Sequence, residues 1–135
     1  MTLIEFKNLP NTTTPLKAEN LNNNFNSIVE SGSNENGNWV KFSDGTMICE
    51  ATIIKNIENT IPWNNFYIGE VFNIPFAQSF ATLHSCNIDI YSTKNMWKMS
   101  GNVPNLNGTG SFYTISPESF TTDVNFHIIA TGKWK

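Results

Sequence analysis

A β-hairpin signature, GNWVKFSDGTMICEA at residues 37–51, constrains the fold of this chain more than any other feature. Its first, aromatic strand leads into an Asp44-Gly45 pair, and Asp-Gly supplies the positive φ angles of a tight hairpin turn. Beyond the turn, the side chains alternate with a period of two, and only one face is wholly apolar. We expect that face to lie in the core; it carries Met47, Cys49, Ala51 and Ile53.

Strand-like runs follow at a spacing of roughly ten residues, and turn-forming residues separate them. They lie at 66–74, 81–92, 96–103, 111–116 and 122–134, with polar loops expected at 55–65 and 104–110. Two runs alternate clearly, and their inward faces are expected to carry His84, Cys86, Ile88 and Ile90, and Val124, Phe126, Ile128 and Ala130. Strands at this spacing predict a mainly β chain that folds as an antiparallel sandwich or a barrel.

A short helix is predicted ahead of the hairpin. Residues 1–11 are expected to form an apolar extended arm. Thr14 suits the N-cap of the helix, and Pro15 suits its first position. The helix is expected to reach about Glu30 and to end before Ser31-Gly32. Its apolar stripe packs either on its own β-domain or on copies of itself around an axis. The polar linker 33–37 favours the second alternative, with a trimer interface of Ala18, Leu21, Phe25 and Ile28. Residues 1–36 are thus an arm with a trimerising helix, and 37–135 a β-sandwich domain.

Composition limits the partners. The chain has 135 residues, enough for one domain with a core of its own. Only 14% of the residues are charged and the net charge is -3, so no basic surface for nucleic acid is expected. No apolar run approaches the roughly 20 residues of a membrane span, and the N-terminus lacks the features of a signal peptide. We therefore expect synthesis in the cytoplasm, without membrane insertion.

No pattern predicts a catalytic, metal or cofactor site. Cys49 and Cys86 are expected to be reduced core residues, although a bridge between them stays open. The chain has 2 histidines and no zinc motif, so no metal or cofactor is expected. A carboxylate pair such as Glu118 and Asp123 could serve glycoside hydrolysis, but these residues lie in a predicted loop where charges are usually solvated. We expect no enzymatic activity.

Four segments resemble phage tail proteins. The hairpin at 37–51, the segment VFNIPF at 71–76 and the final FHIIATGKW at 126–134 resemble the phage tail-fibre C-terminal domain, although Thr131 stands where that family usually has Ile. TPLKAENLN at 14–22 resembles a helix start in tail and baseplate proteins from phages of Gram-positive bacteria. The resemblance implies a homotrimer in the virion tail that attaches to the host surface. The 36 residues printed ahead of the hairpin contain no long fibrous shaft of the kind that usually precedes this domain, so a baseplate accessory protein stays open as the alternative.

A saccharide is the expected ligand. Weakly charged surfaces rich in Asn suit sugar hydroxyls, which need neutral donors and acceptors, and saccharide sites usually add an aromatic face. The candidate glycan-binding residues are Trp97, Tyr91, Asn95, Trp63, Tyr113 and Asn105, whereas Trp39 and Trp134 are expected to pack in the fold. The predicted function is non-catalytic attachment to a host cell-surface glycan. The alternatives are a structural tail or baseplate protein that binds another phage protein, and a saccharide-cleaving enzyme that uses Glu118 or Asp123.

Overall fold

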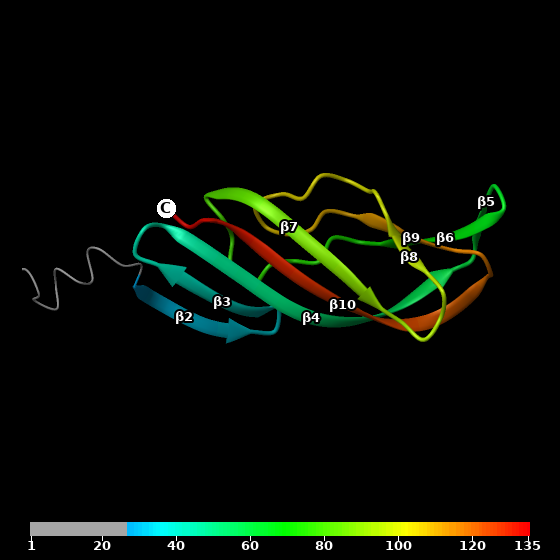
Figure 1. Cartoon of the computed structure of the whole chain (residues 1–135), viewed down its shortest axis with the longest axis horizontal. Coiled ribbons are helices and arrows are strands. Elements are labelled where there is room, and N and C mark those ends of the chain that lie inside the picture. Colours follow the sequence, from blue (N-terminus) through cyan, green and yellow to red (C-terminus); the bar gives the residue numbers. More distant parts are fainter. Residues whose placement is uncertain (1–26) are drawn as a thin grey trace, which may run out of the picture.

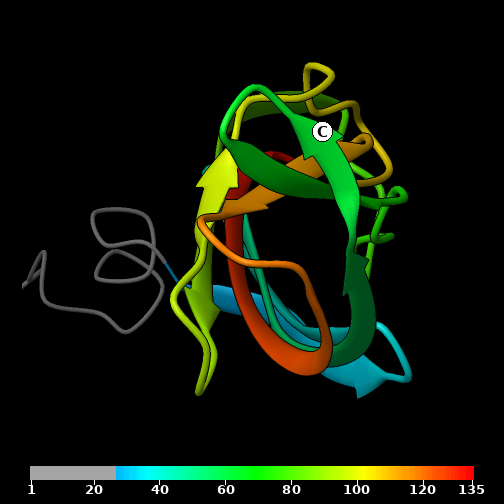
Figure 2. The same cartoon turned by 90° about the vertical axis from the view of Figure 1, so that its right-hand side faces the viewer.

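The computed structural model describes residues 27–135, and this part of the chain is mainly β, with antiparallel strands in two sheets (Figure 1). The large, five-stranded sheet has the order β2-β3-β4-β10-β7; its strands are β2 (Ile28–Asn34), β3 (Gly37–Phe42), β4 (Thr46–Asn59), β10 (Phe120–Lys133) and β7 (Thr82–Tyr91). The small, four-stranded sheet has the order β5-β6-β9-β8; its strands are β5 (Ile61–Trp63), β6 (Phe66–Val71), β9 (Phe112–Ser116) and β8 (Trp97–Met99). Viewed from the end, the strands enclose a common interior, as in a sandwich (Figure 2).

The predicted hairpin is confirmed. The Gly45 amide donates to the Phe42 carbonyl at 3.0 Å, and Gly45 has a φ of 96°, which a residue with a side chain rarely adopts. The Asp44 carboxylate accepts a hydrogen bond from the Thr46 amide at 2.9 Å. On the strand that follows, β4, the expected inward residues Met47, Cys49 and Ala51 are buried, and Ile53 packs against the core.

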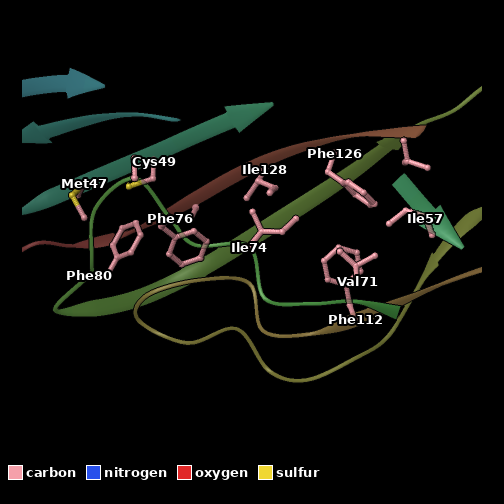
Figure 3. Packing of buried hydrophobic residues seen from close by; sticks show 13 residues of the cluster. Met47, Cys49, Ile57, Val71, Ile74, Phe76, Phe80, Phe112, Phe126 and Ile128 are labelled. Atoms are coloured by element: carbon pink, nitrogen blue, oxygen red, sulfur yellow. The ribbon is translucent and has the colours of Figure 1, made fainter. Parts of the chain in front are cut away.

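The core lies between the two sheets (Figure 3). The β10 alternation is confirmed, since Val124, Phe126, Ile128 and Ala130 are all buried. Phe126 meets Phe112 of the small sheet edge to face, with ring centroids 5.6 Å apart. Ile74, Phe76 and Phe80 add side chains from the connection between β6 and β7. Each fully buried side chain of this kind stabilises the fold by about 1.5–3 kcal/mol.

A buried polar cluster joins the two sheets at the end of β4. The Asn59 side-chain amide donates to the Tyr67 carbonyl at 3.0 Å and to the Ser116 hydroxyl, and its oxygen accepts from the Thr114 hydroxyl. Asn59, Thr114 and Ser116 are fully buried. β6 passes so close to β4 here that a Cβ at Gly69 would lie 2.7 Å from the Glu58 carbonyl oxygen. The satisfied amide therefore fixes the small sheet against the large one.

The prediction that the first helix reaches about Glu30 is wrong, because Ile28–Asn34 forms strand β2. β2 pairs with β3 from Ile28↔Phe42 to Asn34↔Gly37, and the predicted linker is the hairpin turn between them. Glu30 is the one strong helix former in this stretch, so its helix preference is weak and pairing with β3 overrides it. Ile28 begins this strand and is exposed, while the other members of the predicted trimer stripe and the helix start at Thr14 lie outside the described residues.

Three strand boundaries also differ from the prediction. The expected loop at 55–65 contains the end of β4 and all of β5, because Lys55–Asn59 continue the pairing with Phe120–Val124 of β10. The runs expected at 66–74 and 96–103 are shorter, since β6 ends at Val71 and β8 at Met99. Pairing partners that are distant in sequence decide these boundaries, and no local signal marks them.

A bulge corrects the predicted face of β7. Cys86, Ile88 and Ile90 pack against the core as expected, but His84 is exposed. The pairing with β10 shifts between Thr131↔Ser85 and Gly132↔Leu83, so His84 is an extra residue without a partner. An extra residue reverses the alternation, and Leu83 therefore takes the inward place that the sequence assigned to His84.

The two cysteines do not form a bridge. Cys49 and Cys86 are both free thiols. They pair with the same residue, Ala130, from the two sides of β10, so their backbones are separated by two strand spacings of about 4.8 Å each. A disulfide requires Cα atoms within about 7 Å of each other, which excludes the alternative that they are joined. Burial raises the pKa of both thiols above its ordinary value.

Candidate functional site

The outer face of the small sheet carries a row of large apolar side chains, one from each strand. Inward positions of this sheet are occupied by small or core residues such as Gly69, Val71, Phe112 and Thr114. Residues between them in sequence must point outward, because side chains alternate along a strand. Pairing aligns four of them as Ile61↔Ile68↔Ile115↔Trp97, which we call the Ile–Trp row.

Aromatic side chains flank the Ile–Trp row on both sides. One neighbouring row is Trp63↔Phe66, and the other is Glu70↔Tyr113↔Met99. Trp97 and Trp63 are 53% and 45% exposed, so large parts of both rings face solvent. With strands about 4.8 Å apart, the row spans about 14 Å from β5 to β8. This is room for two or three sugar rings, or for a short peptide.

The structure brings together three of the six predicted glycan-binding residues. Trp97, Tyr113 and Trp63 all point outward from the small sheet, and Trp97 and Tyr113 are diagonal neighbours on β8 and β9, about 7–8 Å apart. Asn95 lies just before β8, where it borders a hollow of about 230 Å³ with Lys94 and Glu118.

Two of the six lie elsewhere. Tyr91 pairs with Asn125, which in turn pairs with Ile54, so it belongs to the outer face of the large sheet. Asn105 borders a different hollow, beside β7. Neither residue is part of the outer face of the small sheet, which carries the Ile–Trp row and its flanking aromatic side chains and which we call the Ile–Trp face.

The apolar members of this face were missed in the sequence. Phe66, Tyr67 and Ile68 are all apolar or aromatic, so the start of β6 shows no alternation from which an outward side could be read. Ile61 falls in a stretch that resembles a polar loop, from which only Trp63 was chosen as a candidate. Only the register between β5, β6 and β9 shows that these side chains share one surface.

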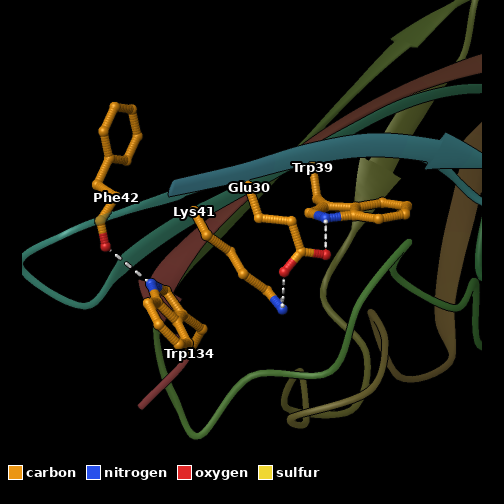
Figure 4. A network of polar contacts seen from close by, with 5 residues as sticks. All are labelled: Glu30, Trp39, Lys41, Phe42 and Trp134. Carbon is orange, nitrogen blue, oxygen red and sulfur yellow. Dashed lines mark hydrogen bonds and ion pairs between the residues drawn. The ribbon is translucent and has the colours of Figure 1, made fainter. Parts of the chain in front are cut away.

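Trp39 and Trp134 pack against the core, as predicted. Figure 4 shows their polar contacts. The Trp39 indole N–H donates to Glu30 at 3.3 Å, and the other Glu30 oxygen accepts from Lys41 at 3.2 Å. The Trp134 indole N–H donates to the Phe42 carbonyl at 2.9 Å, and the Lys41 ammonium lies 5.4 Å from the Trp134 ring centroid. Both indoles are thereby engaged in tying β2, β3 and the C-terminal end together.

The carboxylates considered for hydrolysis have separate surroundings. Asp123 accepts from the Asn56 amide at 2.9 Å on the outer face of the large sheet. Glu118 follows β9 and borders the hollow near Lys94. Within residues 27–135, no group of three metal-ligating side chains is assembled, and no helix of this part is long and apolar enough to span a bilayer.

Comparison with known proteins shows a likeness of fold. No protein-family model and no curated protein matches the chain. Among solved structures, the C-terminal part of the R1 pyocin fibre of P. aeruginosa is similar, with a TM-score of 0.50 and 12% sequence identity. The match covers 86% of this chain and 31% of the pyocin fibre chain. The described fold is therefore similar to a segment of this pyocin fibre, about a third of that chain.

Proposed function

We propose that this chain is a receptor-binding component of a phage or prophage tail, that it attaches to a host cell-surface glycan, and that it does so without catalysis. The Ile–Trp face carries this proposal, since it presents exposed Trp97 and Trp63, together with half-buried Tyr113, on the outer surface of one sheet. Flat indole and phenol rings offer apolar area with polar edges, which suits the mixed surface of a sugar ring. The likeness in fold to a pyocin fibre segment supports the location in a tail.

The polar groups near the Ile–Trp face are mostly neutral, so they suit a sugar better than they suit a charged ligand. Asn95 precedes Trp97 by two residues, and the chain as a whole has few charges. Asn offers two donors and an acceptor without a charge to desolvate. Glu70 pairs with Tyr113 and Lys94 precedes Asn95, and the charges of these two residues are opposite. Lys98 follows Trp97 directly, but it pairs with the inward residue Thr114 and so lies on the other side of the sheet.

Binding to purified cell walls tests the proposal. The full chain should sediment with walls from one or more Gram-positive bacteria, and periodate oxidation of the wall sugars should abolish sedimentation. Trp97→Ala should weaken binding by about tenfold or more, the usual effect of losing an aromatic hot spot. Tyr91→Ala is the matched control, because Tyr91 is similarly exposed, at 59%, on the other sheet. Binding that survives both periodate and Trp97→Ala would refute the glycan site.

A structural role in the tail is the second candidate, favoured by one feature of the same face. Three of the four residues in the Ile–Trp row are isoleucines, and aliphatic side chains suit a protein partner as well as a sugar. A chain in this role would bind no cell wall, while Ile68→Asp and Trp97→Ala would prevent its incorporation into tails. Release of reducing sugar from walls, lost in Glu118→Gln or Asp123→Asn, would instead identify a saccharide-cleaving enzyme.

We extend the proposal to a homotrimer held by the three members of the predicted stripe that precede β2, namely Ala18, Leu21 and Phe25. The test compares the full chain with a chain that begins at Ser27, by light scattering coupled to size exclusion. A cut at Ser27 keeps β2 and its pairing with β3, which a cut at Gly37 would remove. We expect a trimer for the full chain and a smaller species for the shortened one. A monomer in both cases would contradict the trimer.

A further inference from the structure

A polar hollow adjoins the Ile–Trp face at the end where β8 begins and β9 ends. Asn95 and Pro117 line this hollow, and each lies two residues beyond a member of the Ile–Trp row, Trp97 or Ile115. Two residues of chain span at most about 7 Å, so the lining of the hollow begins close to both members of the row. A ligand that lies on the row can therefore reach into the hollow.

Two opposite charges border this hollow without pairing. Its volume is about 230 Å³, which is less than the roughly 300–1,000 Å³ of pockets that enclose a drug-sized ligand, so it suits a single substituent. Lys94 and Glu118 are part of the lining, and neither forms an ion pair with another side chain in the described part of the chain. Both residues are exposed, so both charges are accessible to a ligand.

The two loops that carry these charges are held by hydrogen bonds and a ring contact. The Lys94 amide donates to the Ser92 hydroxyl at 3.0 Å, and the Lys94 ammonium lies 5.9 Å from the centroid of the Phe120 ring. On the other side of the hollow, the Glu118 carbonyl accepts from the buried Ser116 hydroxyl at 2.7 Å. A site that is ordered in advance loses less conformational entropy when a ligand binds.

We infer that this hollow binds a substituent of the host glycan that carries an ammonium group and an anionic group side by side. The inference rests on the proposed attachment to a glycan and names the chemistry of one part of that ligand. An anion alone would be attracted by Lys94 and repelled by Glu118, and a cation alone would meet the reverse. A substituent with both charges satisfies both side chains, and Pro117 and Phe120 offer apolar contact to the carbon atoms between its charges. Such a substituent has no net charge, which suits the mostly neutral surroundings.

Charge-removing variants of the full chain test the inference in equilibrium binding to purified cell walls. Lys94→Gln and Glu118→Gln should each weaken binding about two- to fivefold, the usual range for an exposed charge contact. Lys98→Gln is the matched control, because Lys98 is also exposed but pairs with the inward residue Thr114 and so lies on the other side of the sheet. All three variants should unfold in urea at nearly the wild-type midpoint, since each changes an exposed side chain. Unchanged wall binding of Lys94→Gln and Glu118→Gln would overturn the inference.

Acetylation of the walls tests the ammonium group of the ligand. Acetic anhydride converts wall ammonium groups to neutral amides, and it should weaken binding of the wild-type chain by about the same factor as Glu118→Gln does. On acetylated walls, Glu118→Gln should cause no further loss, because the charge that it contacts is gone, whereas Trp97→Ala should still weaken binding. A full additional loss in Glu118→Gln on acetylated walls would overturn the pairing of Glu118 with a ligand ammonium.

A second treatment identifies the anionic group. Coupling of methylamine by carbodiimide neutralises the carboxylates of the walls and leaves phosphates unchanged. If the effect of Lys94→Gln disappears on these walls, the anion is a carboxylate, and if the effect persists, the anion is one that the coupling spares, such as a phosphate.

Failure of this inference is distinguishable from failure of the proposed function. If periodate and Trp97→Ala reduce binding but acetylation leaves it unchanged, the chain binds a glycan without using the hollow, and only the inference is overturned. If the full chain binds no walls at all, the proposed function and the inference are both overturned.

Discussion

Replacing Asn59 by Ala should destabilise this fold more than any other single change to an uncharged polar residue described here. The side chain is fully buried and bonds Tyr67, Ser116 and Thr114. Truncation removes the side-chain donor from the Tyr67 carbonyl, and the Thr114 hydroxyl retains only a long 3.5 Å contact to the Gly69 carbonyl. Ser116 keeps a good partner, the Glu118 carbonyl at 2.7 Å.

The magnitude follows from counting the groups that lose their partners. Each buried polar group left unsatisfied costs about 1–3 kcal/mol, and two such groups give a loss of about 2–6 kcal/mol in the free energy of unfolding. Asn56→Ala is the matched control, since Asn56 lies three residues earlier on the same strand but bonds Asp123 on the exposed face. Loss of an exposed contact of this kind should change stability by about 0.5 kcal/mol or less.

Urea unfolding followed by tryptophan fluorescence, at one fixed protein concentration, measures both variants. A midpoint for Asn59→Ala that coincides with that of Asn56→Ala would refute the reasoning, because it would mean that the buried amide carries no net stability. Asn59→Asp adds a pH test: burial raises the pKa of the new carboxyl, so the variant should be closest to wild type below about pH 4 and lose stability as the pH rises toward 7.

Three further predictions concern stability. Phe126→Ala, which removes a buried ring from the contact with Phe112, should lower the free energy of unfolding by about 3–5 kcal/mol in urea titrations. Gly69→Ala should destabilise by about 1–3 kcal/mol in the same assay, because its Cβ would overlap the Glu58 carbonyl oxygen. Burial raises the pKa of the Cys49 thiol in the folded state. The stabilising contribution of the protonated thiol is therefore complete at neutral pH and is lost as the pH rises through this raised pKa. Cys49→Ala should flatten the fall in thermal midpoint above about pH 9.

Local signals predicted seven of the nine described strands, although not all of their ends. The Asp44-Gly45 turn and the alternation of β10 are encoded within a few residues of sequence, and both were predicted correctly. The sequences of β2 and β5 contain no comparable turn motif or alternation of side chains. Ile28–Asn34 becomes a strand because β3 offers a partner, and Ile61–Trp63 becomes one because β6 folds back on it. Pairing between segments is a property of the folded chain, and propensity alone cannot supply it.

The residues of the Ile–Trp face also could not be grouped without knowledge of the strand pairing. Trp97, Trp63 and Tyr113 could be chosen from the sequence because exposed aromatics suit a sugar, but so could Tyr91, which lies on the other sheet. Residue type selects candidates, and only register tells which of them share a surface. The bulge at His84 is an example on one strand, because a single extra residue reverses which side chains of β7 face inward.

Stability and binding should separate cleanly in this fold. Ile115 of the Ile–Trp row lies on β9 between Thr114 and Ser116, the two inward residues that bond Asn59. The buried cluster therefore fixes the strand that carries the centre of the row without touching the outer surface. Asn59→Ala, assayed where it is still folded, should bind cell walls nearly as wild type does, whereas Trp97→Ala should unfold like wild type and bind poorly. If both variants lost binding in proportion to stability, the outer face would have no role of its own, and attachment would have to be sought on another surface of the chain.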